Sequence, residues 1–181
     1  MNLPNFLTLT RILLVPFFVV AVAYGSYPWA IGVFFAAGIT DGLDGLFARS
    51  LGQKTRLGAV LDPVADKLLL TSAYITLGVL HRIPFWLTLV VVSRDVIIAL
   101  GILVILLLGF RYEIRPRMVS KVTTVCQIVT VLTVLCAQIC RVGPRCLITG
   151  LYLLTALLTI VSGLYYLYLG IKIVNVEKKE H

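Results

Sequence analysis

The chain has 181 residues, a length that predicts one domain spanning residues 1–181. Hydrophobic residues make up 60% of it, charged residues only 13%, and the mean hydropathy is +1.02. These values exclude an ordinary soluble globular protein, because the apolar runs are long enough to cross a bilayer. The net charge of +8 comes with no polar domain that could hold a nucleic acid, so we expect the basic loops to face anionic lipid headgroups.

The apolar segments predict an all-α polytopic membrane protein with six transmembrane helices and a short N-terminal interfacial segment. No cleavable signal peptide is expected, because the first apolar segment begins almost at Met1 and lacks a basic region. The predicted spans are residues 6–24, 28–47, 59–80, 85–110, 122–139 and 146–173.

The first span begins with three polar residues at regular spacing. Asn5, Thr8 and Arg11 recur every three residues, which predicts a polar stripe on its first turns. The alternative is that Arg11 stands alone at a membrane edge and extends its side chain to water.

The fourth span contains an arginine next to an aspartate. Arg94 lies ten residues past Pro84. At about 1.5 Å per residue this distance is roughly 15 Å, near the middle of a bilayer. We expect an arginine at that depth to face the helix bundle or a wet cavity. The alternative is a purely structural pair of Arg94 and Asp95.

The distribution of Lys and Arg predicts the orientation in the membrane. If the N-terminus is cytoplasmic, twelve of the sixteen lie on the cytoplasmic side and three in the opposite turns, while Arg94 lies within a span. This excess predicts that both termini face the cytoplasm. No organelle-targeting segment is seen, which favours the inner membrane of a bacterium.

Four of the eight acidic residues lie in one stretch, DGLDGLFARSLGQKTRLGAVLDPVAD, at residues 41–66. Asp41 and Asp44 are three residues apart, and Asp62 and Asp66 are four apart, so each pair shares a helix face. Two helix ends joined by a short basic loop can bring the four carboxylates together. Carboxylate oxygens suit Mg²⁺ or Mn²⁺, and such an ion would neutralise charge on a leaving phosphate.

Two other interpretations fit buried carboxylates. They also form proton relays and cation pathways in transporters, or structural charge networks. A transporter spreads its charges along a path across the bilayer, whereas these four are predicted at one depth beside a basic loop. This placement favours metal-assisted phosphoryl transfer at the cytoplasmic face.

The same stretch matches the pattern D-x2-D-G-x2-A-R-x8-G-x3-D-x3-D at every fixed position. This pattern resembles the signature of the CDP-alcohol phosphatidyltransferases, and the likeness extends over nearly the whole chain. The resemblance implies one membrane domain of six helices, usually a homodimer, that displaces CMP from CDP-diacylglycerol with an alcohol. The matching residues are Asp41, Asp44, Gly45, Ala48, Arg49, Gly58, Asp62 and Asp66.

The resemblance also implies roles for single residues. Asp41, Asp44 and Asp62 would bind Mg²⁺ or Mn²⁺, and Asp66 would complete the metal site or act as general base on the acceptor hydroxyl. The residues implied in CDP-lipid binding are Asn5, Thr8, Asp41, Gly45, Ala48, Arg49 and Gly58, and those implied in acceptor binding are Lys67, Arg94 and Lys121.

The acceptor is predicted from the fourth and fifth spans. Family members that make phosphatidylglycerophosphate typically have R-E-F and then G-L-R in the fourth helix, and G-K-x-K-T at the start of the fifth. Here Asp95 replaces the glutamate, Ile102 stands in place of the second arginine, and Thr123 in place of the second lysine.

The motif S-R-D-V followed by S-K-x-x-T-x-x-Q is similar to that of the cardiolipin synthases of the same family. Their acceptor, phosphatidylglycerol, has a singly charged phosphodiester, which needs fewer cations than a phosphate monoester. We therefore expect phosphatidylglycerol as acceptor, with glycerol 3-phosphate as the alternative. A membrane transporter or an inactive lipid-binding relative is the remote alternative.

Overall fold

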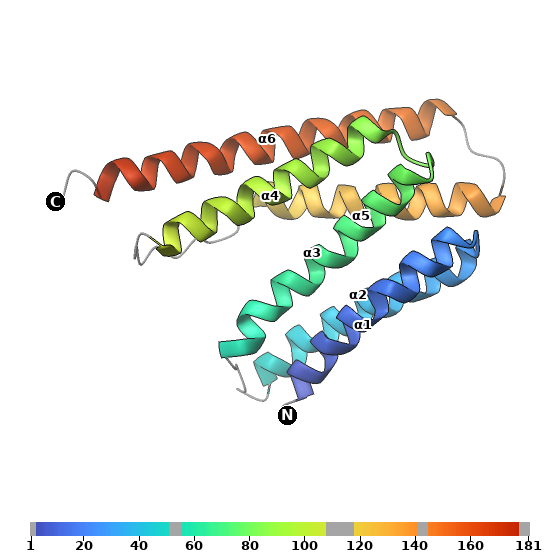
Figure 1. Cartoon of the computed structure of the whole chain (residues 1–181), viewed down its shortest axis with the longest axis horizontal. Coiled ribbons are helices and arrows are strands. Elements are labelled where there is room, and N and C mark those ends of the chain that lie inside the picture. The colour runs from blue at the N-terminus through green and yellow to red at the C-terminus, as the bar shows by residue number, and fades with distance from the viewer. Residues whose placement is uncertain (1–2, 51–55, 108–117, 141–144, 178–181) are drawn as a thin grey trace. The chain divides into compact units, whose positions relative to one another are not determined.

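The computed structural model describes the backbone of residues 3–50, 56–107, 118–140 and 145–177, and the side chains of residues 9–40, 67–101, 118–140 and 146–170. The described backbone is all-helical, as predicted, and contains no strand (Figure 1). Its helices are α1 (Leu3–Ala23), α2 (Tyr27–Ser50), α3 (Arg56–Val79), α4 (Phe85–Leu107), α5 (Met118–Cys140) and α6 (Arg145–Glu177).

The helices follow the predicted spans, but three of them begin three or four residues earlier than predicted. α1 begins at Leu3, so the described residues of the expected N-terminal interfacial segment form the first turn of this helix. Pro4 is compatible with that turn, because a first-turn N–H has no partner within the helix. α3 begins at Arg56 and α5 at Met118, whereas their predicted starts were residues 59 and 122.

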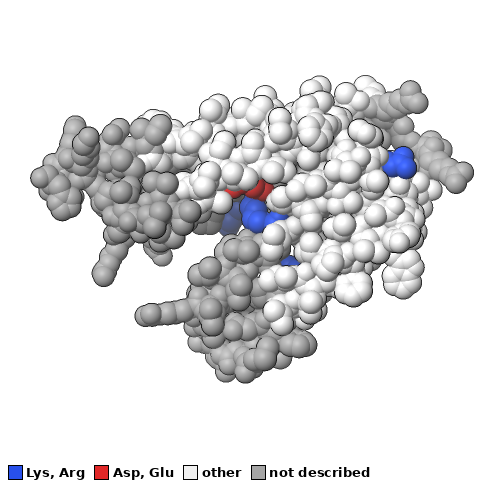
Figure 2. All heavy atoms as spheres, viewed as in Figure 1, with Lys and Arg blue, Asp and Glu red and all other residues white. Residues whose placement is uncertain are grey.

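The described surface is that of a membrane protein. Two helical stretches, Met118–Cys140 and Cys146–Gly170, are long and apolar enough to cross a bilayer, and α1, α2 and α3 contribute shorter apolar stretches. Large apolar side chains such as Phe17 and Leu157 are more than half exposed. Figure 2 shows few charged atoms among the described residues. Lipid is the solvent that suits such a surface.

The chain forms two compact units. The first unit comprises Met1–Ile83 and Val131–Gly143, and the second unit comprises Pro84–Thr130 and Pro144–His181. α5 is one continuous helix whose first part belongs to the second unit and whose last part belongs to the first.

The first unit has an apolar interior. α1 packs against both α2 and α3 (Figure 1). Phe18 of α1 and Phe34 of α2 meet with ring centroids 5.7 Å apart and planes tilted by 51°, an arrangement that aromatic pairs favour. Phe18, Tyr74 and Leu77 are completely buried.

Two helices of the first unit end in the same way. After α1 the N–H of Ser26 donates to the carbonyl of Ala21, and Gly25 has φ of 71°. After α3 the N–H of Arg82 donates to the carbonyl of Leu77, and His81 has φ of 53°. Both ends are Schellman motifs, in which a left-handed residue allows the chain to satisfy the last helical carbonyls.

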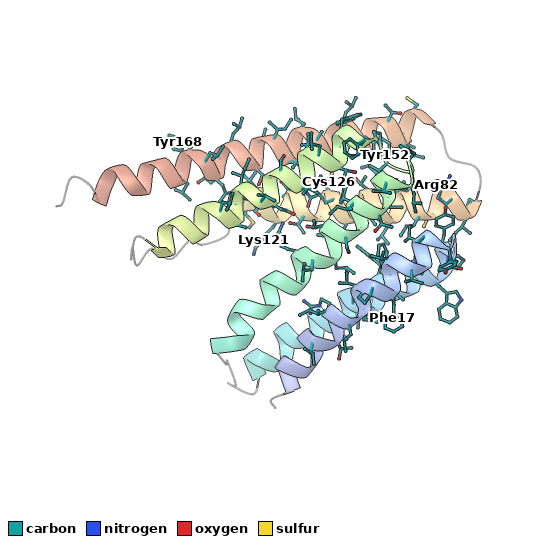
Figure 3. All side chains as sticks on the ribbon, in the orientation of Figure 1. Phe17, Arg82, Lys121, Cys126, Tyr152 and Tyr168 are labelled. Atoms are coloured by element: carbon teal, nitrogen blue, oxygen red, sulfur yellow. The ribbon has the colours of Figure 1, made fainter. Side chains whose placement is uncertain are left out.

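The second unit has a polar seam between α5 and α6. Thr130 and Thr155 are hydrogen-bonded at 2.7 Å, and the Cys126 thiol lies 3.2 Å from the Thr155 hydroxyl. The side-chain amide of Gln127 donates to the Thr159 hydroxyl at 3.3 Å. Interhelical hydrogen bonds of this kind hold helices together where lipid is as apolar as the side chains. Cys126, labelled in Figure 3, is thus a buried packing residue.

Candidate active site

The backbone brings the acidic segment to one end of the first unit. α1, α2 and α3 are joined as successive antiparallel helices, so the start of α1, the end of α2 and the start of α3 lie at the same end (Figure 1). Asp41 and Asp44 lie in the last three turns of α2, and Asp62 and Asp66 near the start of α3. The helix ends that carry the two aspartate pairs are therefore neighbours.

The side chains of these aspartates lie outside the described residues, as do the other predicted CDP-lipid ligands. Their individual roles therefore stay predictions. Among the described side chains, no group of three or more His, Cys, Asp or Glu is placed to hold a metal ion. The donor set of the acidic segment nevertheless fits Mg²⁺ or Mn²⁺, since four carboxylates on two neighbouring helix ends are hard oxygen ligands.

Arg11 does not extend to water as an isolated arginine at a membrane edge would. It lies on α1 and is only 1% exposed. Because α1 packs against α2 and α3, Arg11 contributes a buried positive charge to the unit that contains the acidic segment. A buried charge of this kind requires compensation by its surroundings.

Two of the three residues predicted to bind the acceptor alcohol are lysines. Lys67 directly follows Asp66 in α3 and is half-buried. Lys121 is exposed and lies in the first turns of α5 (Figure 3). They belong to the first and the second unit respectively.

The third predicted ligand, Arg94, is buried among polar partners of the second unit. Its Nη1 donates to Asp95 Oδ1 at 2.7 Å, and its Nη2 donates to the hydroxyls of Ser120 at 3.0 Å and Ser162 at 2.9 Å. Its side chain is 3% exposed. The expectation that Arg94 faces the interior of the helix bundle is thus met, and it also forms the pair with Asp95 considered as the alternative.

α6 contacts Arg94 through two further residues. A Cβ atom on Gly163 would lie 3.4 Å from Arg94 Cγ, at van der Waals contact, so the stem of Arg94 lies close to the backbone of α6 at this residue. The Tyr166 ring centroid lies 5.9 Å from Arg94 Cζ, within reach of a cation–π interaction. We call Arg94, Asp95, Ser120, Ser162, Gly163 and Tyr166 the Arg94 cluster.

The sequence pattern predicted no role for the residues that α6 contributes to the cluster. Thr155, Thr159 and Ser162 follow one another at intervals of four and three residues, so they share a helix face. All three are completely buried. A polar stripe on an otherwise apolar span was the available signal for this face.

Thr123 occupies the position at which phosphatidylglycerophosphate-forming members have a lysine. Its side chain is completely buried. Its hydroxyl lies 2.8 Å from the carbonyl of Val119 and 3.2 Å from that of Leu158 on α6. This position therefore contributes to helix packing and supplies no cation.

Comparison with known proteins agrees with the sequence signature. The model of the CDP-alcohol phosphatidyltransferase family matches residues 1–164. The chain is 33% identical over 198 residues to a cardiolipin synthase (CMP-forming) of Rattus norvegicus, an overlap of 98% of this chain but only 64% of that protein.

The chain is also similar to proteins named for the synthesis of phosphatidylglycerophosphate from glycerol 3-phosphate. A CDP-diacylglycerol–glycerol-3-phosphate 3-phosphatidyltransferase of Salmonella typhimurium is 38% identical over 173 residues, covering 92% of this chain and 93% of that enzyme. A probable phosphatidylglycerophosphate synthase of Mycobacterium tuberculosis is 42% identical over 123 residues, covering 64% of this chain and 56% of that protein. By its signature, its helical fold and these matches, the chain belongs to the CDP-alcohol phosphatidyltransferase family.

Proposed function

We propose that this protein transfers the phosphatidyl group of CDP-diacylglycerol to phosphatidylglycerol, giving cardiolipin and CMP. Its family membership and the unbroken signature at residues 41–66 support phosphatidyl transfer. The rat relative supports the acceptor, since it is named a cardiolipin synthase and aligns with 98% of the chain.

The proposed reaction is a direct displacement at phosphorus. Asp66, as general base, takes the proton of the free glycerol hydroxyl of phosphatidylglycerol, and the oxygen forms a bond to the phosphatidyl phosphorus. The bond from this phosphorus to the bridging oxygen of CMP breaks, and CMP leaves with the electron pair. Asp41, Asp44 and Asp62 would hold Mg²⁺ or Mn²⁺, which when bound would balance the charge that develops on the leaving phosphate.

The protein's other residues would bind and orient the two substrates. We assign the CDP-lipid to Asn5 and Thr8 of α1 and to the signature residues Gly45, Arg49 and Gly58, with Ala48 and Asp41. Small residues among these let a phosphate or a base approach the helix backbone. We assign the acceptor's phosphodiester to Lys67 and Lys121.

The observation that favours phosphatidylglycerol is the burial and hydrogen bonding of Thr123 in the second unit. A phosphate monoester such as glycerol 3-phosphate carries up to two negative charges and benefits from several cations, whereas a phosphodiester carries one. Thr123, in place of a lysine, is buried and bonded to backbone carbonyls. Arg94 is already paired with Asp95 at 2.7 Å. The described residues of the second unit thus offer little positive charge to an acceptor besides Lys121.

The test is to offer each acceptor in turn to the purified protein with CDP-diacylglycerol and Mg²⁺ or Mn²⁺. We expect CMP release and cardiolipin formation with phosphatidylglycerol, and little release with glycerol 3-phosphate. Release with glycerol 3-phosphate and none with phosphatidylglycerol would contradict the proposal. Absence of CMP with every alcohol would instead favour the transporter interpretation.

Glycerol 3-phosphate remains the second candidate acceptor for one specific reason. The Salmonella enzyme named for that acceptor aligns over 93% of its own length, whereas the rat protein aligns over 64%. The acceptor assay separates these two candidates directly.

We also propose that the enzyme lies in a bacterial inner membrane with both termini and the acidic end of the first unit facing the cytoplasm. The asymmetry of Lys and Arg between the two sides supports this orientation. A homodimer, as the family resemblance implies, is part of the same proposal. The test is Arg82→Cys and Lys121→Cys, each in a variant without the four native cysteines. An impermeant reagent applied from outside should label the first and not the second, and the reverse would contradict the orientation.

A further inference from the structure

The Arg94 cluster joins three helices of the second unit through a single guanidinium. We propose that Arg94 is a positioning residue that fixes the first turns of α5, and hence Lys121, for the acceptor, and that it does not itself bind the acceptor phosphate. This inference rests on the proposed function, because it concerns the acceptor side of that reaction.

Arg94 donates hydrogen bonds to one residue on each of the three helices. The two hydrogens of Nη2 are taken by Ser120 and Ser162, and Nη1 donates to Asp95. The Nε–H is buried and has no hydrogen-bond partner among the described residues. A guanidinium presents its donors in a fixed plane, so a phosphate that approached Nη2 would have to displace Ser120 or Ser162. The side chain, only 3% exposed, is also shielded from an incoming ligand.

The α6 side of the cluster fixes where the guanidinium lies. Ser162 and Gly163 are buried, and the stem of Arg94 passes within 3.4 Å of the place a Cβ on Gly163 would occupy. The Tyr166 ring lies on the same helix, 5.9 Å from Arg94 Cζ. α4 and α6 are therefore held against each other in one register, and the guanidinium is directed toward α5.

The α5 side of the cluster is the part that reaches Lys121. Ser120 accepts the Arg94 hydrogen bond at 3.0 Å and immediately precedes Lys121. The next turn is held as well, because the Thr123 hydroxyl bonds to the carbonyls of Val119 and of Leu158 on α6. Lys121 itself is exposed. Its backbone is thus fixed by buried neighbours while its ammonium group stays available.

Such positioning affects catalysis because it sets how far Lys121 lies from the bound acceptor. A misplacement of about 1 Å by a residue remote from the reacting atoms is able to cost roughly a hundredfold in rate. The Ser120 contact depends on an arginine, because a lysine at position 94 would keep the charge but lose the forked geometry. A direct phosphate ligand and a positioning residue therefore respond differently to the same substitutions.

The test compares four single variants and one double variant in the CMP-release assay with phosphatidylglycerol. Ser162→Ala and Ser120→Ala each remove one Arg94 contact, and Arg94→Lys removes the fork. Thr159→Ala is the matched control, because Thr159 lies on the same buried face of α6 and bonds Gln127 instead of Arg94. Values of kcat and KM are measured for both substrates.

We expect Ser162→Ala and Ser120→Ala to raise the KM for phosphatidylglycerol about tenfold, with the KM for CDP-diacylglycerol unchanged and Thr159→Ala close to wild type. Arg94→Lys should raise it further, and adding Ser162→Ala to Arg94→Lys should have no additional effect, since the contact is already lost.

Two results would overturn the inference while leaving the proposed function intact. One is an active wild type in which the serine variants behave like Thr159→Ala. The other is an Arg94→Lys variant with wild-type kinetics, because charge alone would then be sufficient. A wild type that releases no CMP with any alcohol would remove the proposed function and this inference together. The two serines lie on different helices, so one variant remains if the other fails to fold.

Discussion

The first and second units bury different kinds of side chain. Among the described residues, Arg11 is the one buried polar or charged side chain of the first unit, whose interior is otherwise built from residues such as Phe18, Phe34 and Leu77. The second unit buries Arg94, Gln127, Ser162 and five threonines. Surrounded by lipid, the first unit depends on close packing and the second on hydrogen bonds between helices.

This difference separates two ways of placing charge in a membrane protein. The first unit keeps an apolar body and concentrates its carboxylates at one end, on the last turns of α2 and the first turns of α3. The second unit places its charge within the body and satisfies it locally, as in the pair of Arg94 and Asp95. We propose that the first arrangement serves ligand binding and that the second sets helix positions.

The largest effect is expected at the acidic end of the first unit. Asp66→Asn should lower kcat by about three orders of magnitude, because an amide cannot accept the acceptor's proton. Asp41→Asn should weaken both metal and CDP-lipid binding. Binding of CDP-diacylglycerol, measured by calorimetry with Mg²⁺ present, distinguishes a general base at position 66 from a metal ligand at position 41. Equal loss of binding in both variants would argue that Asp66 is chiefly a metal ligand.

A packing variant tests the apolar character of the first unit. Phe18→Ala should lower the free energy of unfolding by about 3 kcal/mol, because it removes a completely buried ring and leaves a cavity facing Phe34. Denaturant unfolding in detergent measures the loss. Phe17→Ala is the control, since its side chain is 64% exposed. A similar loss in both variants would show that burial in this unit does not determine stability.

The corresponding variant in the second unit removes hydrogen bonds and keeps volume. Thr155→Val should cost about 1 kcal/mol, in the range measured for polar contacts between membrane helices. It removes the contacts to Thr130 and Cys126. Thr155→Ser keeps the hydroxyl and should lie closer to wild type in the same unfolding measurement. A loss for Thr155→Val as large as that for Phe18→Ala would mean that hydrogen bonds dominate the second unit far more than we propose.

The same contrast explains what the sequence predicts well. Asp41, Asp44, Asp62 and Asp66 interrupt apolar spans at helical spacing, so both their helices and their shared end are predictable from local pattern and chain reversal. The observed α2 and α3 agree with that expectation at the level of the backbone. The two aspartate pairs are also close in sequence, so few arrangements of the helices are able to separate them.

The partners of Arg94 lacked such local information. Ser120 and Ser162 lie 26 and 68 residues away from it along the chain. Whether they meet depends on how α4, α5 and α6 rotate about their axes and how closely they approach. Serine and threonine also occur throughout membrane helices as simple packing residues. The sequence alone therefore indicated a buried arginine but did not indicate which hydroxyls it binds.

The smallest expected effect concerns the two Schellman turns of the first unit. Gly25 and His81 occupy the same left-handed position after α1 and α3, with φ of 71° and 53°. A residue with a Cβ is strained there, so His81→Gly should raise the free energy of unfolding by about 0.5–1 kcal/mol, and Gly25→Ala should lower it by a similar amount. The unfolding midpoint in detergent measures both. If the two substitutions shifted it in the same direction, the left-handed strain at His81 would be offset by a contact that its imidazole makes in the folded turn.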